Sequence, residues 1–336
     1  MANQKKQLNA GLNLLRILMC YEVVLCHLWM DGSEMMNHPF LADAEMWAVP
    51  SFFIMSIYFT ASTIMNSSGE KLLKRMYRLI MPQIVWTVIY FAYYWIIGTE
   101  KGNWDRFWLQ LFLGHTFNMT MWYQIDLIII TLLLVLVYFL IPRKTAHLVM
   151  TAVCAACFLL QYSGLNYKFF SKYDSAVYYP LGRIVECIPF AFIGLLLYDY
   201  DVLEAARKHR IFSMLTCCIS LYTLATCNIF YNTYGFDYQS IEWSFAGLFL
   251  VILFYVLPFD RLPKEIGSFI SYVSSFTMGI YFMHRMMNVV FKRTVAIKAG
   301  MSTGTLLYCS IIFGLCWLVS MLISLIPGKF SKQLVK

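Results

Sequence analysis

The sequence predicts an all-α integral membrane protein, a bundle of about ten transmembrane helices with both termini in the cytoplasm. Hydrophobic residues make up 60% of its 336 residues and charged residues 13%, whereas a soluble domain is roughly 45–50% apolar and ~25% charged. The apolar residues also fall into runs close to the roughly 20 residues that a helix needs to cross a bilayer. Both observations favour helices surrounded by lipid over a soluble fold.

Ten segments qualify as spans, in the order 13–30, 47–66, 79–97, 121–141, 147–163, 183–200, 211–231, 242–259, 269–291 and 304–327. The polar stretches between them are short. We therefore expect a single polytopic membrane domain over residues 1–336, with no soluble domain. The first segment follows Lys5 and Lys6, as a signal peptide would, but Arg16, Glu22 and His27 interrupt it and no small-x-small cleavage site follows. We expect a retained first helix.

The basic residues assign an orientation to these spans. With the N-terminus inside, most Lys and Arg fall in inner segments, namely residues 5–6, 71–78, 143–144, 207–210, 261–264 and 329–336. This is the positive-inside pattern, so the net charge of +8 indicates topology and no nucleic-acid partner. All cysteines lie in or beside apolar runs, and Cys154-x-x-Cys157 has no second pair, so we expect no metal.

The first helix carries three ionisable residues where lipid disfavours them, Arg16, Glu22 and His27. Arg16 and His27 are eleven residues apart, which places both on one helix face about 16 Å apart along the axis. This face predicts a fixed cation and a titratable base directed into the bundle. Alternatively, Arg16 reaches the inner headgroups and His27 is a satisfied polar residue. Glu22 points about 140° away from His27.

At the inner end of the third span, Arg75 and Arg78 are helix neighbours and Lys74 is adjacent. Paired guanidiniums suit the recognition of phosphate. The alternative is topological charge or contact with anionic lipid headgroups.

Other spans also hold ionisable residues. Asp126 lies near the outer end of the fourth span, and Glu186 lies three residues from Arg183, a spacing that favours a structural ion pair. Near the outer end of the ninth span, Tyr281 and His284 share a helix face. The charge topology places His284 at a depth similar to that of His27. Either the two imidazoles flank a shared polar cavity, or each is hydrogen-bonded independently near the interface.

Five short motifs occur in one order along the chain. They are Asn13-Leu-Leu-Arg16 through His27, Val49-Pro50-Ser51-Phe52-Phe53 through Ser56, Arg75-Met-Tyr-Arg78 with Pro82, Met121-Trp122-Tyr123 with Pro142, and Gly279-Ile-Tyr281-Phe-Met-His284. Together they resemble the membrane-bound acyltransferase family 3, which includes bacterial O-acetyltransferases of surface glycans. Two positions depart from its pattern: Ile57 replaces a common Gly, and the segment after Trp122 lacks a Glu found in many O-antigen members. This places the sequence among the short, stand-alone members.

The resemblance implies a multi-pass enzyme of the bacterial cell membrane that moves an acetyl group from cytoplasmic acetyl-CoA to a hydroxyl of an extracytoplasmic or lipid-linked glycan. It implies His27 and Arg16 as catalytic residues and no metal. The residues expected to hold the coenzyme are Arg75, Arg78 and Lys74, and those expected near the acceptor are Tyr281, His284, Ser56, Trp122 and Glu22. A covalent intermediate on Ser56 or His27 and direct transfer both stay open, as do another acyl group such as succinyl and the oligomeric state.

A transporter or exporter of a surface polysaccharide is the competing interpretation, because ten helices and a buried charge track suit it equally. Such a protein usually has internal repeats and helices broken at Gly or Pro near the midplane. The sequence has only scattered prolines, Pro50, Pro82 and Pro189, and no repeat. A module that senses or moves an amino acid has no support in the sequence.

Overall fold

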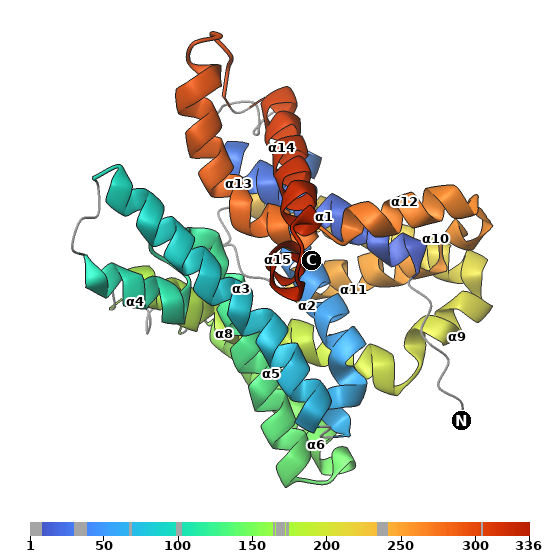
Figure 1. Cartoon of the computed structure of the whole chain (residues 1–336). Coiled ribbons are helices and arrows are strands. Elements are labelled where there is room, and N and C mark those ends of the chain that lie inside the picture. Colours follow the sequence, from blue (N-terminus) through green and yellow to red (C-terminus); the bar gives the residue numbers. More distant parts are fainter. Residues whose placement is uncertain are drawn as a thin grey trace. The chain divides into compact units, whose positions relative to one another are not determined.

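The computed structural model describes residues 9–29, 39–66, 69–98, 103–163, 165, 172, 175–233, 241–303 and 305–336. Within these residues the secondary structure is helical and no strand occurs. The chain divides into two compact units, the first formed by residues 1–52, 201–237 and 245–336 and the second by 53–200 and 238–244. Figure 1 labels the helices of both units.

The first unit begins with α1 (Ala10–Trp29) and the first half of α2 (Pro39–Met65). It continues with α9 (Val202–Lys208), α10 (Arg210–Thr233), most of α11 (Ile241–Val256), η3 (Phe259–Arg261), α12 (Lys264–Ser274), α13 (Thr277–Phe291), the π-helical η4 (Lys292–Ala296), α14 (Leu306–Leu325) and α15 (Lys329–Val335).

Helix α1 is the centre of the first unit. It packs against α12, α13 and α14, and Figure 1 shows these helices next to it. Its buried residues Leu12, Leu15 and Met19 recur every three or four positions, the spacing of one helix face. The polar residues Asn13 and Arg16 of α1 meet other helices of the unit, α12 and α13.

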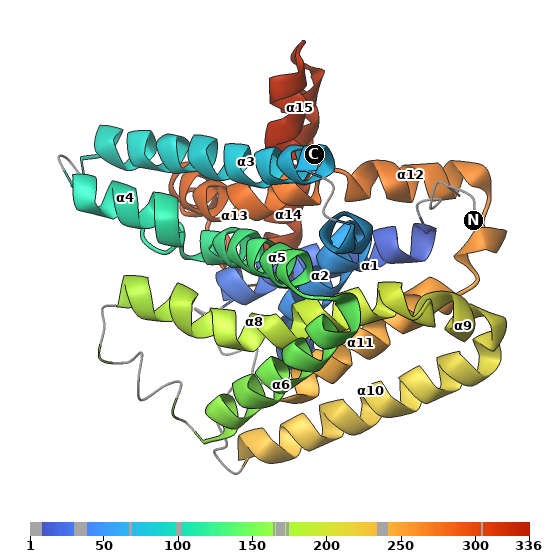
Figure 2. The same ribbon diagram turned by 90° about the horizontal axis from the view of Figure 1, so that it is seen from below.

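The second unit holds the second half of α2, α3 (Gly69–Ile96), α4 (Trp104–Leu113), η2 (Met119–Met121), α5 (Trp122–Leu140), α6 (Arg143–Tyr162) and α8 (Ser175–Asp199). Helix α8 packs against α5 and α6, and α3 lies beside α4, as Figure 2 shows. A Cβ atom on Gly194 of α8 would lie 2.4 Å from the carbonyl oxygen of Ile54 on α2. The missing side chain therefore permits the close approach of these helices.

Seven helices are long and apolar enough to cross a membrane, and the bent pair α12–α13 makes up to eight, in the described part of the chain. The expected seventh and eighth spans correspond to two shorter apolar stretches, Arg210–Thr226 and Phe245–Val256. The prediction of an all-helical, multi-pass membrane protein is confirmed in this form. The count of ten spans, the cytoplasmic termini and the single domain over residues 1–336 stay predictions.

Three features differ from the predicted spans. Helix α3 begins at Gly69, well before residue 79, and its first turns are polar, with Lys74 bonded to Glu70 at 2.6 Å. The predicted ninth span is two helices, α12 and α13, bent by 50°. Helix α4 was not expected at all; it exposes Trp104, Trp108 and Phe112 on one face, as interfacial helices do.

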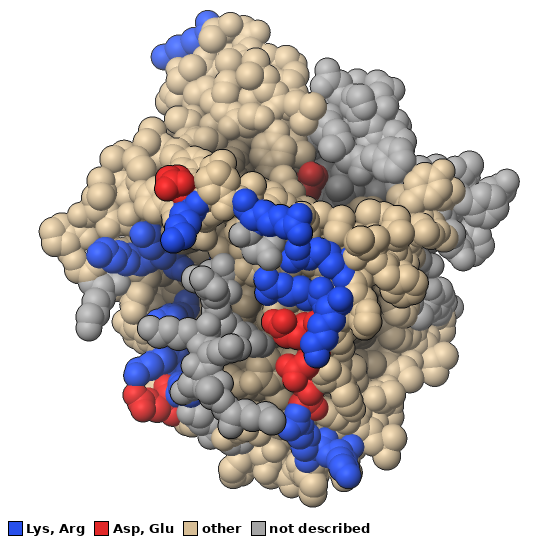
Figure 3. Space-filling view, turned by 90° about the vertical axis from the view of Figure 1, so that its right-hand side faces the viewer, with Lys and Arg blue, Asp and Glu red and all other residues tan. Residues whose placement is uncertain are grey.

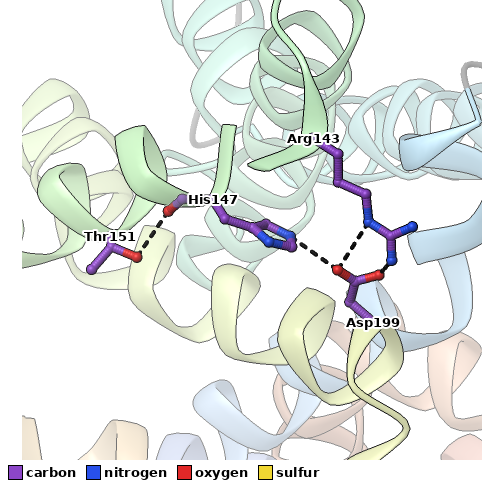
Figure 4. A network of polar contacts seen from close by, with 4 residues as sticks. All are labelled: Arg143, His147, Thr151 and Asp199. Atoms are coloured by element: carbon purple, nitrogen blue, oxygen red, sulfur yellow. Dashed lines mark hydrogen bonds and ion pairs between the residues drawn. The ribbon is translucent and has the colours of Figure 1, made fainter. Parts of the chain in front are cut away.

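Charged side chains concentrate in particular places. On the face drawn in Figure 3, Lys and Arg gather in bands with fewer acids among them. Figure 4 shows a separate network in the second unit, where Asp199 at the end of α8 receives a hydrogen bond from Arg143 Nε at 3.0 Å and lies 3.2 Å from His147 Nε2. A second ion pair joins the same arginine and aspartate. This network ties the start of α6 to the end of α8.

Candidate functional site

A stacked pair of imidazoles is the central feature of the first unit. The rings of His27, in the last turn of α1, and His284 of α13 have centroids 5.5 Å apart and planes 27° apart. His284 is fully buried and His27 is half-buried. Two positive charges 5.5 Å apart repel by about 3 kcal/mol at an effective dielectric constant of about 20. The pair therefore holds one proton far more readily than two.

The backbone of α13 fixes the tautomer of neutral His284. Its Nδ1 lies 2.7 Å from the carbonyl oxygen of Tyr281 and 3.3 Å from that of Ile280. A carbonyl oxygen only accepts, so Nδ1 carries the hydrogen and Nε2 the lone pair. His284 Nε2 is buried and has no hydrogen-bond partner among the described residues. This arrangement presents an imidazole ready to accept a proton.

Arg16 contacts α13, the helix that His27 also contacts. One of its terminal nitrogens donates to Thr277 Oγ1 at 3.4 Å, at the first residue of α13. Between them on α1, the Cys20 thiol donates to the carbonyl of Thr277 at 3.5 Å. Arg16 and His27 thus both contact α13, as expected of residues eleven positions apart.

Asn13 contacts the end of α12, just before its break with α13. Its side-chain nitrogen donates to Ser271 Oγ at 3.0 Å, and its oxygen accepts from Ser274 Oγ at 3.3 Å. Thr277 Oγ1 in turn donates to the carbonyl of Ser274 at 3.0 Å. One turn of α1, from Asn13 to Arg16, therefore contacts both sides of the bend.

Two further predicted residues lie in this unit. The Tyr281 ring is 6.5 Å from that of His284, centroid to centroid, and is tilted by 41°. Glu22 has one carboxylate oxygen buried without a hydrogen-bond partner among the described residues. The unit thus brings Arg16, His27 and His284 to the α1–α13 contact, with Tyr281 beside His284 on α13.

The predicted coenzyme residues lie on the polar start of α3 in the second unit. Arg75 is half-buried, whereas Arg78 and Lys74 are exposed. Lys74 pairs with Glu70 at 2.6 Å, and both side chains are at least 70% exposed. Of the three cations, Arg78 is the most open to an anionic ligand. It is exposed, and it has no acidic neighbour on its own helix face.

A second ionisable cluster lies between α5 and α8. Asp126 is fully buried, and neither carboxylate oxygen has a hydrogen-bond partner among the described residues. Arg183 lies within electrostatic range of Asp126 and Glu186, but its guanidinium stands over the ring of Trp122, 4.6 Å from the centroid. The predicted ion pair between Arg183 and Glu186 is absent from the described residues. Trp122 is thus covered by a cation.

Ser56 lies half-buried on α2, in the second unit, where its carbonyl accepts from Thr60 Oγ1 at 2.7 Å. Sequence reasoning missed Asn13 and Thr277, because their partners are distant in the chain. The described residues hold no group of three His, Cys, Asp or Glu side chains suited to a metal ion.

These features define a multi-pass membrane protein with ionisable groups buried between its helices. The chain matches the family model described as an acyltransferase domain, Acyl_transf_3, over residues 9–321, and it belongs to this acyltransferase family. The resemblance predicted from the five motifs is thus confirmed, and membership indicates acyltransferase activity.

Similar proteins come from Staphylococcus aureus. In strains MSSA476, MRSA252 and N315, a protein named "Probable poly-beta-1,6-N-acetyl-D-glucosamine export protein" is 22% identical over 298 residues, covering 83% of this chain and 82% of the relative. No solved structure matches the chain significantly.

Proposed function

We propose that this protein is a membrane O-acyltransferase that moves an acetyl group from cytoplasmic acetyl-CoA to a hydroxyl of an extracytoplasmic or lipid-linked glycan in the bacterial cell membrane. Family membership supports acyl transfer. The observation that carries the chemistry is the stacked pair of His27 and His284, with a buried Nε2 on His284 that can accept a proton.

The chemistry needs a base and a proton donor in turn. An acceptor hydroxyl attacks the thioester carbonyl, the new C–O bond forms, and the C–S bond breaks to release coenzyme A. His27 takes the hydroxyl proton, and the same proton then goes to the leaving thiolate, so none is gained or lost overall. An imidazole titrates near neutral pH and suits both steps. His284, stacked on His27, disfavours a second proton on the pair.

Arginines serve the charged parts of the reaction. Arg75 and Arg78 hold phosphates of coenzyme A, since guanidinium groups bind phosphate through charge-assisted hydrogen bonds; Lys74 adds charge. Arg16, three turns from His27 on the same helix face, orients the donor, a role compatible with its bond to Thr277. Tyr281 and Glu22 are the nearest acceptor-side candidates in the first unit.

The relatives suggest the kind of acceptor. They are named for poly-β-1,6-N-acetyl-D-glucosamine, a polymer whose free hydroxyls can accept an acyl group. We propose an acceptor of this class, an amino-sugar polymer or its lipid-linked precursor.

Export of such a polymer is the alternative function, and two observations favour it. The relatives are named as export proteins, and α12–α13 is a helix pair bent by 50°, a device that transporters use at their substrate sites. The bend lies at Ser275–Phe276, without Gly or Pro.

Binding of acetyl-CoA to purified protein separates these functions. We expect wild type to bind, Arg75→Ala/Arg78→Ala to lose roughly tenfold or more of the affinity, and His27→Ala to bind normally but lose turnover. Folded wild type that fails to bind at millimolar acetyl-CoA would remove the donor and leave export as the leading function. Normal turnover by His27→Ala would refute the assigned base.

A further inference from the structure

The cluster between α5 and α8 in the second unit has no role in the chemistry above. Its carboxylate, Asp126, is fully buried with both oxygens unpartnered among the described residues. Such a group is strongly unfavourable in a folded protein unless another molecule or function compensates it. The nearby donor, Arg183, does not bond to it and instead stacks on Trp122.

The charges of this cluster narrow the class of ligand. Asp126 and Glu186 disfavour an anion, while Arg183, within electrostatic range of both, disfavours a cation. A neutral hydroxyl fits both sides, because it can donate to a carboxylate and accept from a guanidinium. Sugars present such hydroxyls on adjacent carbons, so that one can face Asp126 and the next Arg183.

The position of the cluster agrees with an extracytoplasmic ligand. Asp126 lies in the second turn of α5, and Arg183 lies close to Leu181, where the apolar part of α8 begins. Both ends are outer ends in the predicted orientation. Asp126 is buried whereas Arg183 is half-buried, so the arginine marks the open side of the cluster.

We propose that Asp126 and Arg183 form a binding subsite for hydroxyls of a saccharide. Asp126 accepts from one sugar hydroxyl, and Arg183, held on the ring of Trp122, donates to its neighbour. The subsite rests on the proposed function only in taking the glycan acceptor as its ligand, and its test uses no acetyl-CoA.

The test measures saccharide binding by calorimetry on the full chain in nanodiscs. Maltoside detergents are avoided, because their headgroup is itself a disaccharide. The probes are maltose, cellobiose, gentiobiose and chitobiose, and the variants are Asp126→Asn, Asp126→Leu and Arg183→Met. Met retains an unbranched side chain over Trp122 without donors. The control is Asp105→Asn, which removes an exposed acid on α4 of the same unit.

We expect wild type and Asp105→Asn to bind at least one probe equally, and the Asp126 and Arg183 variants to bind it at least tenfold more weakly. Asp126→Leu should also melt at the same or a higher temperature than wild type, since it removes an unpartnered buried carboxylate. A purely structural role would lower the melting temperature instead.

Two results would overturn the subsite. One is wild type that binds none of the probes; the other is an Asp126→Leu protein that binds as wild type does or is less stable. A parallel titration with acetyl-CoA keeps the two proposals apart. Acetyl-CoA binding without saccharide binding refutes the subsite alone, and saccharide binding without acetyl-CoA binding refutes the acyl donor alone.

Discussion

The imidazole of His284 stacks on that of His27 while both hydrogen-bonding carbonyls near its Nδ1 belong to its own helix, at Ile280 and Tyr281. The hydrogen bonds that orient His284 therefore come from α13, and its Nε2 stays available for chemistry. The pair links the last turn of α1 to the middle of α13. It is the contact on which the proposed proton transfer depends.

The first prediction concerns this pair. His27→Gln and His284→Gln should each lower the rate of acetyl transfer by about 10²–10⁴, the usual contribution of a general base. The double variant should be little worse than either single one, because residues that act as a unit are not additive. Rates are measured as coenzyme A release with a glycan acceptor.

The matched control is His209→Gln, an exposed histidine after α9 in the same unit. It should keep the wild-type rate. Fully additive losses in the double variant would contradict a shared role. If His27→Gln lost activity while His284→Gln kept the wild-type rate, His284 would be a packing residue only.

The second prediction concerns Asp199, whose side chain is 5% exposed beside Arg143 and His147. Asp199→Asn should lower the free energy of unfolding by about 1–2 kcal/mol, because it leaves the Arg143 guanidinium facing a neutral amide; the 56% exposure of Arg143 limits the loss. Thermal unfolding in nanodiscs measures it.

Glu70→Gln is the comparison for this prediction, since it breaks an ion pair whose two side chains are 70% and 80% exposed. We expect a change within about 0.5 kcal/mol. Equal losses in the two variants would show that burial of Asp199 does not strengthen its network.

The third prediction separates Arg78 from Lys74 on α3. Arg78→Ala should weaken acetyl-CoA binding about tenfold or more, since it removes an exposed guanidinium. Lys74→Ala should weaken it less, because Glu70 already neutralises that lysine. Titration at low and high salt measures both, and raising the salt should shrink the difference. A larger effect of Lys74 would reverse these assignments.

Most of the long helices were predictable because each contains a local apolar run, and the common face of Arg16 and His27 follows from helical geometry alone. The bend after α12 was not predictable in the same way. It contains no Gly or Pro, and the two residues that contact its two sides, Asn13 and Arg16, come from a helix about 260 residues earlier in the chain.

Competition between partners explains another miss. Arg183 and Glu186 are helix neighbours, and their spacing predicted an ion pair. The guanidinium instead lies over Trp122 of α5, a tertiary contact that spacing on α8 does not reveal. Helix α4 was visible in principle, since Trp104, Trp108 and Phe112 recur every four residues, but it is too short to span a membrane.

The last prediction concerns Gly279 on α13. A Cβ there would lie 2.4 Å from Ser320 Oγ of α14 and 3.0 Å from Val335 Cβ of α15. Gly279→Ala should therefore destabilise the protein by about 1–3 kcal/mol through overpacking. A Cβ added at Gly267 on α12 would meet no neighbouring atom within 4 Å. Gly267→Ala should therefore stabilise the protein by up to about 1 kcal/mol through helix propensity.

Adding Ser320→Ala removes the closest atom and should recover part of the loss in Gly279→Ala, a coupling that a double-mutant cycle on thermal unfolding measures. Because His284 lies five residues further along α13, a backbone shift at Gly279 would also move its ring against His27. We therefore expect Gly279→Ala to slow acetyl transfer more than its loss of stability accounts for. Wild-type stability and rate in this variant would show that α13 and α14 are less closely packed than described.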